Sequence, residues 1–362
     1  MCFMVLLAIC VTSHDQLDGH TERDTVGRFR DGSEDERAEA KKSLLGAHDG
    51  ALSSGLKRQL MSIFVNRGLP DKVREDAIEV LSVKAAESEF SPFLDDLVRV
   101  ARLKSESPTI RAGALMGLHL VAKGSKDNST LSSLFTDILN DRTELGAIRF
   151  YAGNALSQTS RDIDKVFALL TAIVSSRDES AEPRLQLMKL AVLTTVAAPE
   201  RCEAFISVLR RVAVDENESV HIRVGALEVV AELLLNAQIE RIDIDLTSRT
   251  SSRELIRLLL DGTAPPRVRD AAGYALSVCP AVDAGAIPEL IDVLSGDDRF
   301  AHEYAIHALC RLGSRAKPSV SQLIRIWNDQ HATEGTREAA KEALLAIDPE
   351  GARGLGLKEG AN

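Results

Sequence analysis

Apolar residues recur along this chain with the spacing of an amphipathic helix, and one version of the pattern returns nine times. In that version an arginine, usually preceded by an apolar residue, is followed three positions later by a small or apolar residue and four positions further on by another apolar residue. Positions −1, +3 and +7 relative to the arginine fall on one stripe of a helix. The pattern therefore predicts a series of helices with an alanine-rich buried face that lets neighbouring helices approach closely.

The helices marked in this way follow one another at intervals of 33 to 46 residues, which indicates an internal repeat. The marking residues are Arg37, Arg74, Arg111, Arg149, Arg184, Arg223, Arg269, His302 and Arg337. A second apolar-periodic segment lies between successive marked helices, as in residues 52–65 and 131–139. Each repeat is therefore predicted to be a helical hairpin, and the chain to be all-α, with every hairpin covering a face of its neighbour.

The composition agrees with packed helices. Of the 362 residues, 44% are hydrophobic and 27% are charged, as in folded globular proteins, whereas only 4% are aromatic, which disfavours a β-sandwich or barrel. The formal net charge of −10 argues against a groove for nucleic acid or for an anionic membrane.

The marked helices carry the pattern V-R-x-x-A. Residues 313–324 (GSRAKPSVSQLI) are similar to the turn and first helix of a repeat unit, and residues 286–291 (AIPELI) repeat that pattern. These motifs and the period resemble HEAT repeats. The resemblance implies an α-solenoid, a right-handed superhelix of about nine HEAT-like helical hairpins, over residues 20–348 with no internal domain boundary. Residues 1–19 would form an apolar N-terminal segment and linker, and residues 349–362, which are rich in glycine, a disordered tail.

One interval, from Arg223 to Arg269, exceeds the others and coincides with residues 238–252 (QIERIDIDLTSRTSS). Isoleucines alternate with charged residues there, which is compatible with a short extended segment. A surface loop is the preferred interpretation.

The arginine series is interpreted as a structural ladder rather than as a phosphate-binding stripe. The ladder residues are Arg74, Arg111, Arg149, Arg223, Arg269 and Arg337, with His302 as a variant. An acid or amide lies eight residues before five of them: Asn66, Asp141, Asp215, Asp261 and Asp329. This spacing predicts that the two side chains meet across the hairpin turn, and the resemblance to HEAT repeats implies that the ladder ties successive repeats together.

The predicted function is a non-catalytic scaffold that binds a protein or peptide on the concave face lined by the second helices. Positions +2, +5 and +9 point away from the core stripe. They are Tyr151, Asn154, Gln158, Gln186, Lys189, Glu228, Glu232, Tyr274, Tyr304, His307 and Arg311. Exposed Tyr and Arg are typical interface anchors.

An enzyme is the alternative. HEAT-like deoxyhypusine hydroxylases hold a di-iron centre with several His-Glu pairs, but this chain has one, His302-Glu303, which cannot complete such a site. A bilin-lyase-like or other ligand-modifying enzyme stays open. No catalytic motif and no metal-ligand spacing is present in the sequence, and no cofactor is expected.

Residues 1–13 are apolar and match the length of a signal-peptide core, and Leu7-Ala8-Ile9-Cys10 resembles a bacterial lipobox, without its usual small residue before the cysteine. Export or lipid anchoring at Cys10 is therefore slightly favoured over a cytoplasmic protein. Membrane contact is expected only through that anchor, and the chain is expected to be a monomer. The five cysteines, Cys2, Cys10, Cys202, Cys279 and Cys310, specify neither a disulfide framework nor a zinc site.

Overall fold

The structure is a computed structural model that describes residues 19–46, 52–84, 90–125, 128–160, 162–195, 199–239, 249–279, 282–296 and 298–357. The chain divides into two compact units, residues 1–161 (unit 1) and 162–362 (unit 2). The sequence predicts one uninterrupted stack instead. Because each repeat touches only its neighbours, a stack of this kind can divide at any hairpin boundary.

Unit 1 contains four helical hairpins within the described residues. They are α1 (Gly19–Asp31) with α2 (Glu34–Gly46), α3 (Ser54–Val65) with α4 (Asp71–Lys84), α6 (Leu94–Arg102) with α7 (Pro108–Gly124), and α8 (Ser129–Asn140) with α9 (Gly146–Thr159). A 3-10 turn, η1 (Ser91–Phe93), precedes α6.

Unit 2 contains five hairpins within the described residues. They are α10 (Ile163–Ser175) with α11 (Ala181–Thr195), α12 (Pro199–Val214) with α13 (Val220–Ile239), α14 (Arg249–Leu260) with α15 (Pro266–Ser277), α16 (Ile287–Ser295) with α17 (Arg299–Leu312), and α18 (Val320–Trp327) with α19 (Glu334–Ile347). The turns η2 (Ala284–Ala286) and η3 (Gly313–Ser319) precede α16 and α18, and α20 (Pro349–Gly354) follows α19.

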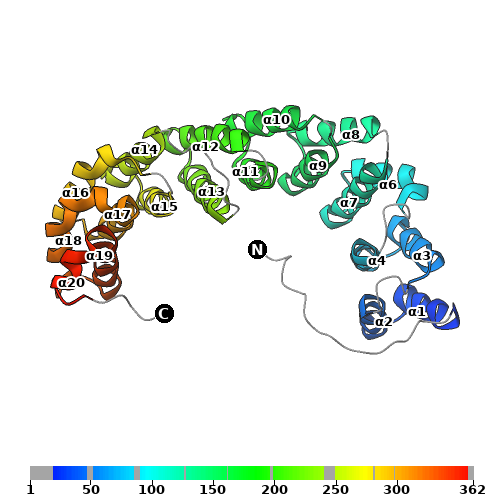
Figure 1. The fold of residues 1–362 in the computed structure, drawn as a ribbon. Helices are drawn as coiled ribbons and strands as arrows, with labels where there is room; N and C mark the ends of the chain where they lie inside the picture. Colours follow the sequence, from blue (N-terminus) through cyan, green and yellow to red (C-terminus); the bar gives the residue numbers. More distant parts are fainter. Residues whose placement is uncertain are drawn as a thin grey trace. The chain divides into compact units, whose positions relative to one another are not determined.

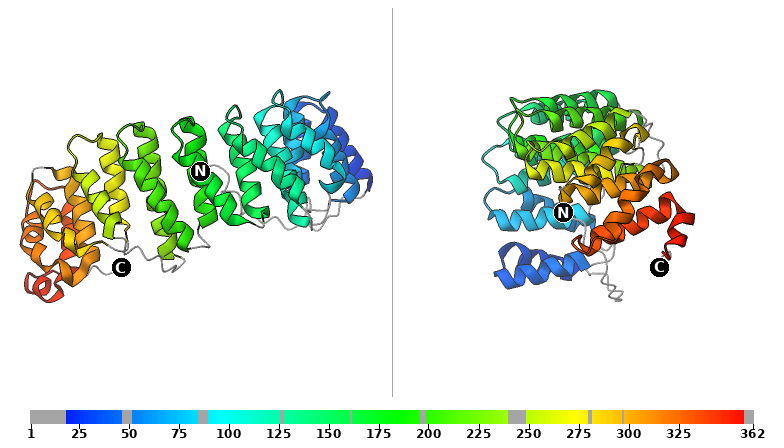
Figure 2. Two further views of the ribbon diagram at one scale, coloured as in Figure 1. Left: turned by 90° about the horizontal axis from the view of Figure 1, so that it is seen from above. Right: turned by 90° about the vertical axis from the view of Figure 1, so that its left-hand side faces the viewer.

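In each unit the first helices of the hairpins form one layer and the second helices form another (Figure 1), and helices of successive hairpins lie side by side (Figure 2). The core lies between the layers. Ala114, Ala152 and Ala226, all at the +3 position, are completely buried. The nine hairpins predicted from the periodicity are confirmed within the described residues, and these contain no strand.

Hydroxyl side chains begin several of these helices. Ser53 Oγ accepts a hydrogen bond from the backbone N–H of Leu56 at 3.1 Å, and Ser107 Oγ accepts one from Ile110 at 3.2 Å. Thr333 Oγ1 accepts from the N–H of Thr336 at 3.1 Å. Each bond satisfies one of the N–H groups that the first turn of a helix leaves without a partner.

The ladder arginines are bound first to the end of their own hairpin's first helix. In five of the predicted ladder residues, Arg74, Arg111, Arg149, Arg223 and Arg269, and also in Arg184, Nε donates to the carbonyl oxygen ten residues earlier, at 2.7–3.0 Å. The arginine therefore satisfies a carbonyl that has no partner inside its helix. The sixth predicted ladder residue, Arg337, instead donates from Nη1 to the carbonyl oxygen of Ala332 in its own turn at 2.7 Å.

The rest of the guanidinium reaches forward to an acid in the next hairpin. Arg74 Nη1 donates to Glu106 Oε2 at 2.7 Å. Arg111 donates to both carboxylate oxygens of Glu144, at 2.7 and 2.5 Å. The same bidentate arrangement joins Arg184 to Glu218 at 2.8 Å, and Arg269 pairs with Asp298. We call each of these four arginine–acid pairs a rung.

The predicted pairing across the turn is wrong, because the acid or amide eight residues before the arginine caps the turn itself. Asn66, Asp141, Asp215, Asp261 and Asp329 each accept a hydrogen bond from the backbone N–H two residues later, at 2.8–3.1 Å. These short side chains stabilise the turn locally. Three of them also pair with a basic residue of the preceding hairpin: Lys104 Nζ donates to Asp141 at 2.6 Å, Arg177 donates to Asp215, and Arg299 Nη2 lies 3.7 Å from Asp329.

Of three predicted segments outside the hairpins, the N-terminal one lies almost entirely outside the described residues, and the predicted loop and tail differ from the structure. Residues 1–18 lie outside the described residues. The predicted loop, residues 238–252, is shorter, because α13 reaches Ile239 and α14 begins at Arg249; residues 240–248 are not described.

The predicted disordered tail contains helix α20. Gly356 ends it in the left-handed conformation (φ +78°), and the N–H of the buried Leu357 donates to Ala352 O at 3.0 Å. Gly356 of this tail therefore caps a helix.

Removing one member of a rung should cost more stability than removing both. The side chains of Arg111 and Glu144 are 3% and 4% exposed. Arg111→Ala leaves a buried carboxylate without its cation, which typically costs about 3–5 kcal/mol. The double variant R111M/E144L, which leaves no buried charge, should be less destabilised than either single variant. Urea denaturation followed by circular dichroism measures this, and an unchanged midpoint for Arg111→Ala would contradict the rung.

The Lys104–Asp141 contact should make a pH-dependent contribution to the free energy of unfolding. The hydrogen bond from Lys104, followed by those from Thr143, lowers the pKa of Asp141 from 3.8 to about 2. A lowered folded-state pKa stabilises the fold above the unfolded-state value, and that stabilisation is lost as the pH falls from about 4 towards 2. Asp141→Asn keeps the turn-capping oxygen, as in Asn66, but removes the charge. The difference in unfolding free energy between the parent and D141N should be constant above this window and shrink within it.

Candidate partner-binding surface

Four of the predicted binding residues are exposed on the second helices of unit 2. Lys189 lies on α11, Glu228 and Glu232 on α13, and Tyr274, which is 47% exposed, on α15. Their side chains make no hydrogen bond or ion pair with any described residue. We call these four residues the second-helix face. Their functional groups are available to a partner.

The other predicted residues of unit 2 are engaged within the fold. Arg311 Nε donates to the carbonyl oxygen of Ser277, on the preceding second helix, at 2.6 Å. His307 Nε2 lies 4.0 Å from Glu303 Oε1 on the same helix. Gln186 is half-buried on α11. Arg311 therefore links neighbouring repeats and is not an unbound surface cation.

Tyr304 is a packing residue rather than a surface anchor. Its ring lies over Gly273 of the neighbouring second helix, where an added Cβ would come within 2.4 Å of Tyr304 Cδ2. The ring also meets Phe300 edge to face at 5.8 Å, and the hydroxyl donates to Asp270. Burial, together with that hydrogen bond, raises the pKa of Tyr304 above its usual range. The phenol is held between two repeats.

In unit 1 the predicted residues lie on α9. Tyr151 is half-buried and meets Phe150 edge to face, with the ring centroids 5.9 Å apart. Gln158 Nε2 donates to Asn154 Oδ1 at 2.9 Å. The structure brings Asn154 and Gln158 together on one face, and Tyr151 lies at its border.

Whether a predicted binding residue is exposed or packed within the fold depends on its position in the repeat. Position +2 is about 60° around the helix from the core position −1, so it lies at the seam between adjacent second helices. Asp76, Gly113, Gly225 and Ala339, all at +2, are buried. Positions +5 and +9 point further from the core. The burial of small residues at +2 is the sequence signal that separates Tyr304 from Tyr274.

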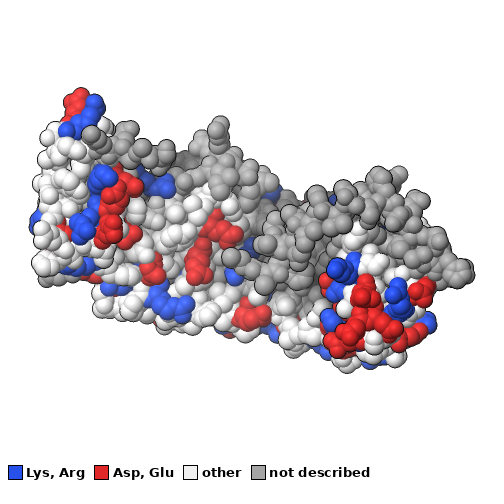
Figure 3. Space-filling model, turned by 90° about the horizontal axis from the view of Figure 1, so that it is seen from below, with Lys and Arg blue, Asp and Glu red and all other residues white. Residues whose placement is uncertain are grey.

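Charged side chains gather in clusters on the side of the molecule shown in Figure 3, where acidic and basic groups often adjoin and uncharged surface lies between the clusters. On unit 2, Glu228 and Glu232 follow one another one turn apart on α13. This stretch of the second-helix face is therefore acidic.

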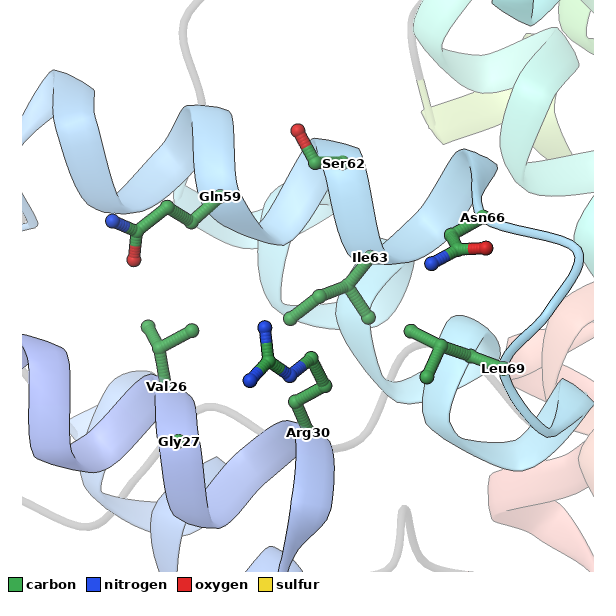
Figure 4. Close-up of a pocket in the computed structure, with 8 residues that line it drawn as sticks. All are labelled: Val26, Gly27, Arg30, Gln59, Ser62, Ile63, Asn66 and Leu69. Carbon is green, nitrogen blue, oxygen red and sulfur yellow. The ribbon is translucent and has the colours of Figure 1, made fainter.

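A groove on unit 1 has a different character (Figure 4). It lies between the first helices α1 and α3 and is lined by Val26, Gly27, Arg30, Gln59, Ser62, Ile63, Asn66 and Leu69. The Arg30 guanidinium extends into the space between the helices, but its Nε donates to Asp31 at 2.9 Å. No cluster of ionisable groups converges in this groove.

Metal-ligating residues do not gather anywhere in the described part of the chain: no group of three or more His, Cys, Asp or Glu side chains is placed to hold an ion. Cys202 and Cys279 are buried, and burial raises the pKa of the Cys202 thiol to about 11. A buried thiol with this pKa stays protonated and unreactive near neutral pH.

Comparison with known proteins identifies the fold. No protein-family model matches the chain, and no curated protein matches it. Among solved structures, Kap121p bound to Nup53p matches with 15% identity and a TM-score of 0.57, covering 90% of this chain and 37% of Kap121p. Kap95p from a complex with RanGDP matches with 12% identity and a TM-score of 0.56, covering 91% and 45%. Importin beta matches with 15% identity and a TM-score of 0.54, covering 90% and 46%.

The chain is a HEAT-like α-solenoid. These neighbours are karyopherins built from HEAT repeats. The solenoid spans less than half the length of each of the three. Among its described helices, none combines the length and apolar character needed to cross a bilayer.

The seam of the solenoid at Gly273 should not accept a methyl group. Gly273→Ala is expected to destabilise unit 2 by about 1–3 kcal/mol, because the added Cβ overlaps the Tyr304 ring. In G273A/Y304A the loss should be smaller than the sum of the single losses. Gly27→Ala is the control, because a Cβ there meets no atom within 4 Å, and it should stabilise α1 slightly. Thermal denaturation measures all four variants; additive losses at 273 and 304 would contradict the packing.

Proposed function

We propose that the solenoid is a scaffold that binds a basic segment of a protein partner through the second-helix face of unit 2. The observation that carries this proposal is that Lys189, Glu228, Glu232 and Tyr274 are exposed and make no bond with the described chain. Glu228 and Glu232 lie one turn apart on α13, and the repulsion between their like charges destabilises that helix by roughly a few tenths of a kcal/mol. A lysine or arginine of the partner relieves that repulsion, and the exposed Tyr274 ring supplies apolar contact.

Close packing of the second helices supports placing this site on a concave face. A Cβ on Gly225 would lie 2.2 Å from Leu185 Cδ2, and one on Gly273 would overlap Tyr304. Glycine at such seams lets the second helices approach, and a layer that packs more tightly than its neighbour lies on the inside of a curve. A concave row of helices suits an extended chain segment.

The structural neighbours support a protein ligand. Kap121p has been solved bound to Nup53p, to the extreme C-terminus of the protein phosphatase Cdc14p and to the SUMO protease Ulp1p. The shared feature is the fold, and the proposal for this chain rests on its own exposed residues.

The enzyme alternative has less support. It requires a pocket with converging ionisable groups on the same face. The cavities at α1–α3 and near the turns of α18 and α19 lie away from the second-helix face.

A photo-crosslinking experiment tests the proposal. Benzoylphenylalanine replaces Tyr274, so that an aromatic group is kept, and the protein is irradiated in its native source. We expect an adduct to one protein species, with the crosslinked peptide rich in Lys or Arg. E228Q/E232Q should reduce the adduct about three- to tenfold, because two surface charge contacts are lost.

The matched control removes the same charge from the opposite layer. Glu203 on α12 and Glu289 on α16 are exposed first-helix residues. E203Q/E289Q changes the net charge by the same amount and should leave the adduct unchanged. Equal loss in both double variants would show a general charge effect, and absence of an adduct would place the interface elsewhere.

A further inference from the structure

One position in the ladder of unit 2 lacks both members of a rung. On α17 the arginine position is His302. In the turn before α19, Ala332 takes the position that Glu106 has before α7 and Glu144 has before α9. Both replacements are shorter than the residues of a rung, so the two hairpins are not joined there by an arginine and a glutamate. We call His302 and Ala332 the open rung.

A cavity of about 490 Å³ lies at the open rung, and both His302 and Ala332 line it. Its size falls within the range of small-ligand sites. The charged and titratable groups around it come from two helices and the turn before α19: Arg299 and His302 on α17, Arg325 on α18, and Asp329 and His331 in the turn.

The two arginines are held in place but keep unused donors. Arg325 Nη2 donates to Leu294 O at 2.8 Å, and Arg299 Nη1 donates to His331 O at 2.5 Å. A guanidinium has five N–H donors. The carboxylate among the lining residues, Asp329, already caps its turn by accepting from the N–H of His331, and it lies 3.7 Å from Arg299 Nη2. The cavity therefore has an excess of positive charge.

His302 preserves one half of the arginine's role. Its Nε2 lies 3.1 Å from the carbonyl oxygen of Gly296, at the end of α16. A carbonyl oxygen only accepts, so Nε2 carries the proton in this contact. The ring satisfies the end of its own first helix, as the arginines do, but it does not extend to the next hairpin.

We propose that the open rung binds a carboxylate supplied from outside the chain, in place of the glutamate that completes the other rungs. The second nitrogen of His302, when protonated, and the free donors of Arg299 and Arg325 hold it. A carboxylate suits the cavity better than a phosphate dianion, because Asp329 and the carbonyl oxygens of Leu294 and Gly296 already place negative charge there. This inference is independent of the proposed function, since the cavity lies at the hairpin turns and not on the second-helix face.

The test uses capped glutamate, N-acetylglutamic acid α-amide, added to the whole protein at constant pH and ionic strength. Histidine ring resonances are followed by proton–carbon NMR. Capped glutamate should shift the rings of His302 and His331 in a saturable way, whereas capped glutamine should not. His307, on the exposed side of the same helix, is the internal control and should not respond.

A substitution that supplies the carboxylate from within the chain provides the second arm. Ala332→Glu should move the His302 resonance to the position seen at saturation with capped glutamate and abolish the response to the probe. Ala332→Gln, the neutral match, should leave the response intact. The proposal is overturned if capped glutamine acts like capped glutamate, if A332E still responds like the parent, or if inorganic phosphate competes more strongly than the carboxylate.

The source of the carboxylate is distinguished by two further probes. A capped Gly-Glu-Gly peptide that binds more tightly than glutarate identifies a glutamate side chain of a partner protein. Equal binding identifies a small dicarboxylate as the ligand. Both results support the carboxylate site. If neither the peptide nor glutarate binds, the carboxylate site is contradicted.

Discussion

The stack depends on a single arrangement: an arginine at the start of a second helix that satisfies the end of its own first helix and also binds an acid in the next hairpin. Arg111 shows both parts, with Nε on Ala101 O at 3.0 Å and the other nitrogens on Glu144. Burying such a pair is unfavourable unless its hydrogen bonds are complete. Because one guanidinium fixes the hairpin and its neighbour together, the register of the stack follows from the position of the arginine.

The seam between second helices imposes a second constraint, one of size. Where one helix has a large residue, the other has a glycine: Gly113 lies against Ile78, Gly225 against Leu185, and Gly273 against Tyr304. A seam of this kind leaves no freedom to change one partner alone. It also determines what remains for binding, because only positions +5 and +9 project clear of it. Glu228, Glu232 and Tyr274 are available for that reason.

The sequence predicts the hairpins and their boundaries well because helical periodicity is a local property, and the same pattern recurs in each repeat. The partners of the arginines are harder to predict, since the contact joins residues more than 30 positions apart, as in Arg74 and Glu106. The glutamates of the rungs lie five residues before the next arginine, whereas the spacing considered in the sequence predicts the acids eight residues before it. Only the offset between successive hairpins shows that Asp141 caps its turn while Glu144 completes a rung.

The same reasoning separates the tyrosines. Tyr274 and Tyr304 occur in helices of the same type, and sequence spacing places both outside the core stripe. Tyr304 lies at position +2, where the absence of a side chain at Gly273 makes room for its ring in the seam, whereas Tyr274 lies at position +5 and is 47% exposed. Burial at a repeat interface therefore depends on the residue across the seam, which belongs to another repeat. A repeat protein can thus acquire a binding residue, or lose one, through a substitution in the neighbouring hairpin, and the open rung at His302 shows the same dependence for charge.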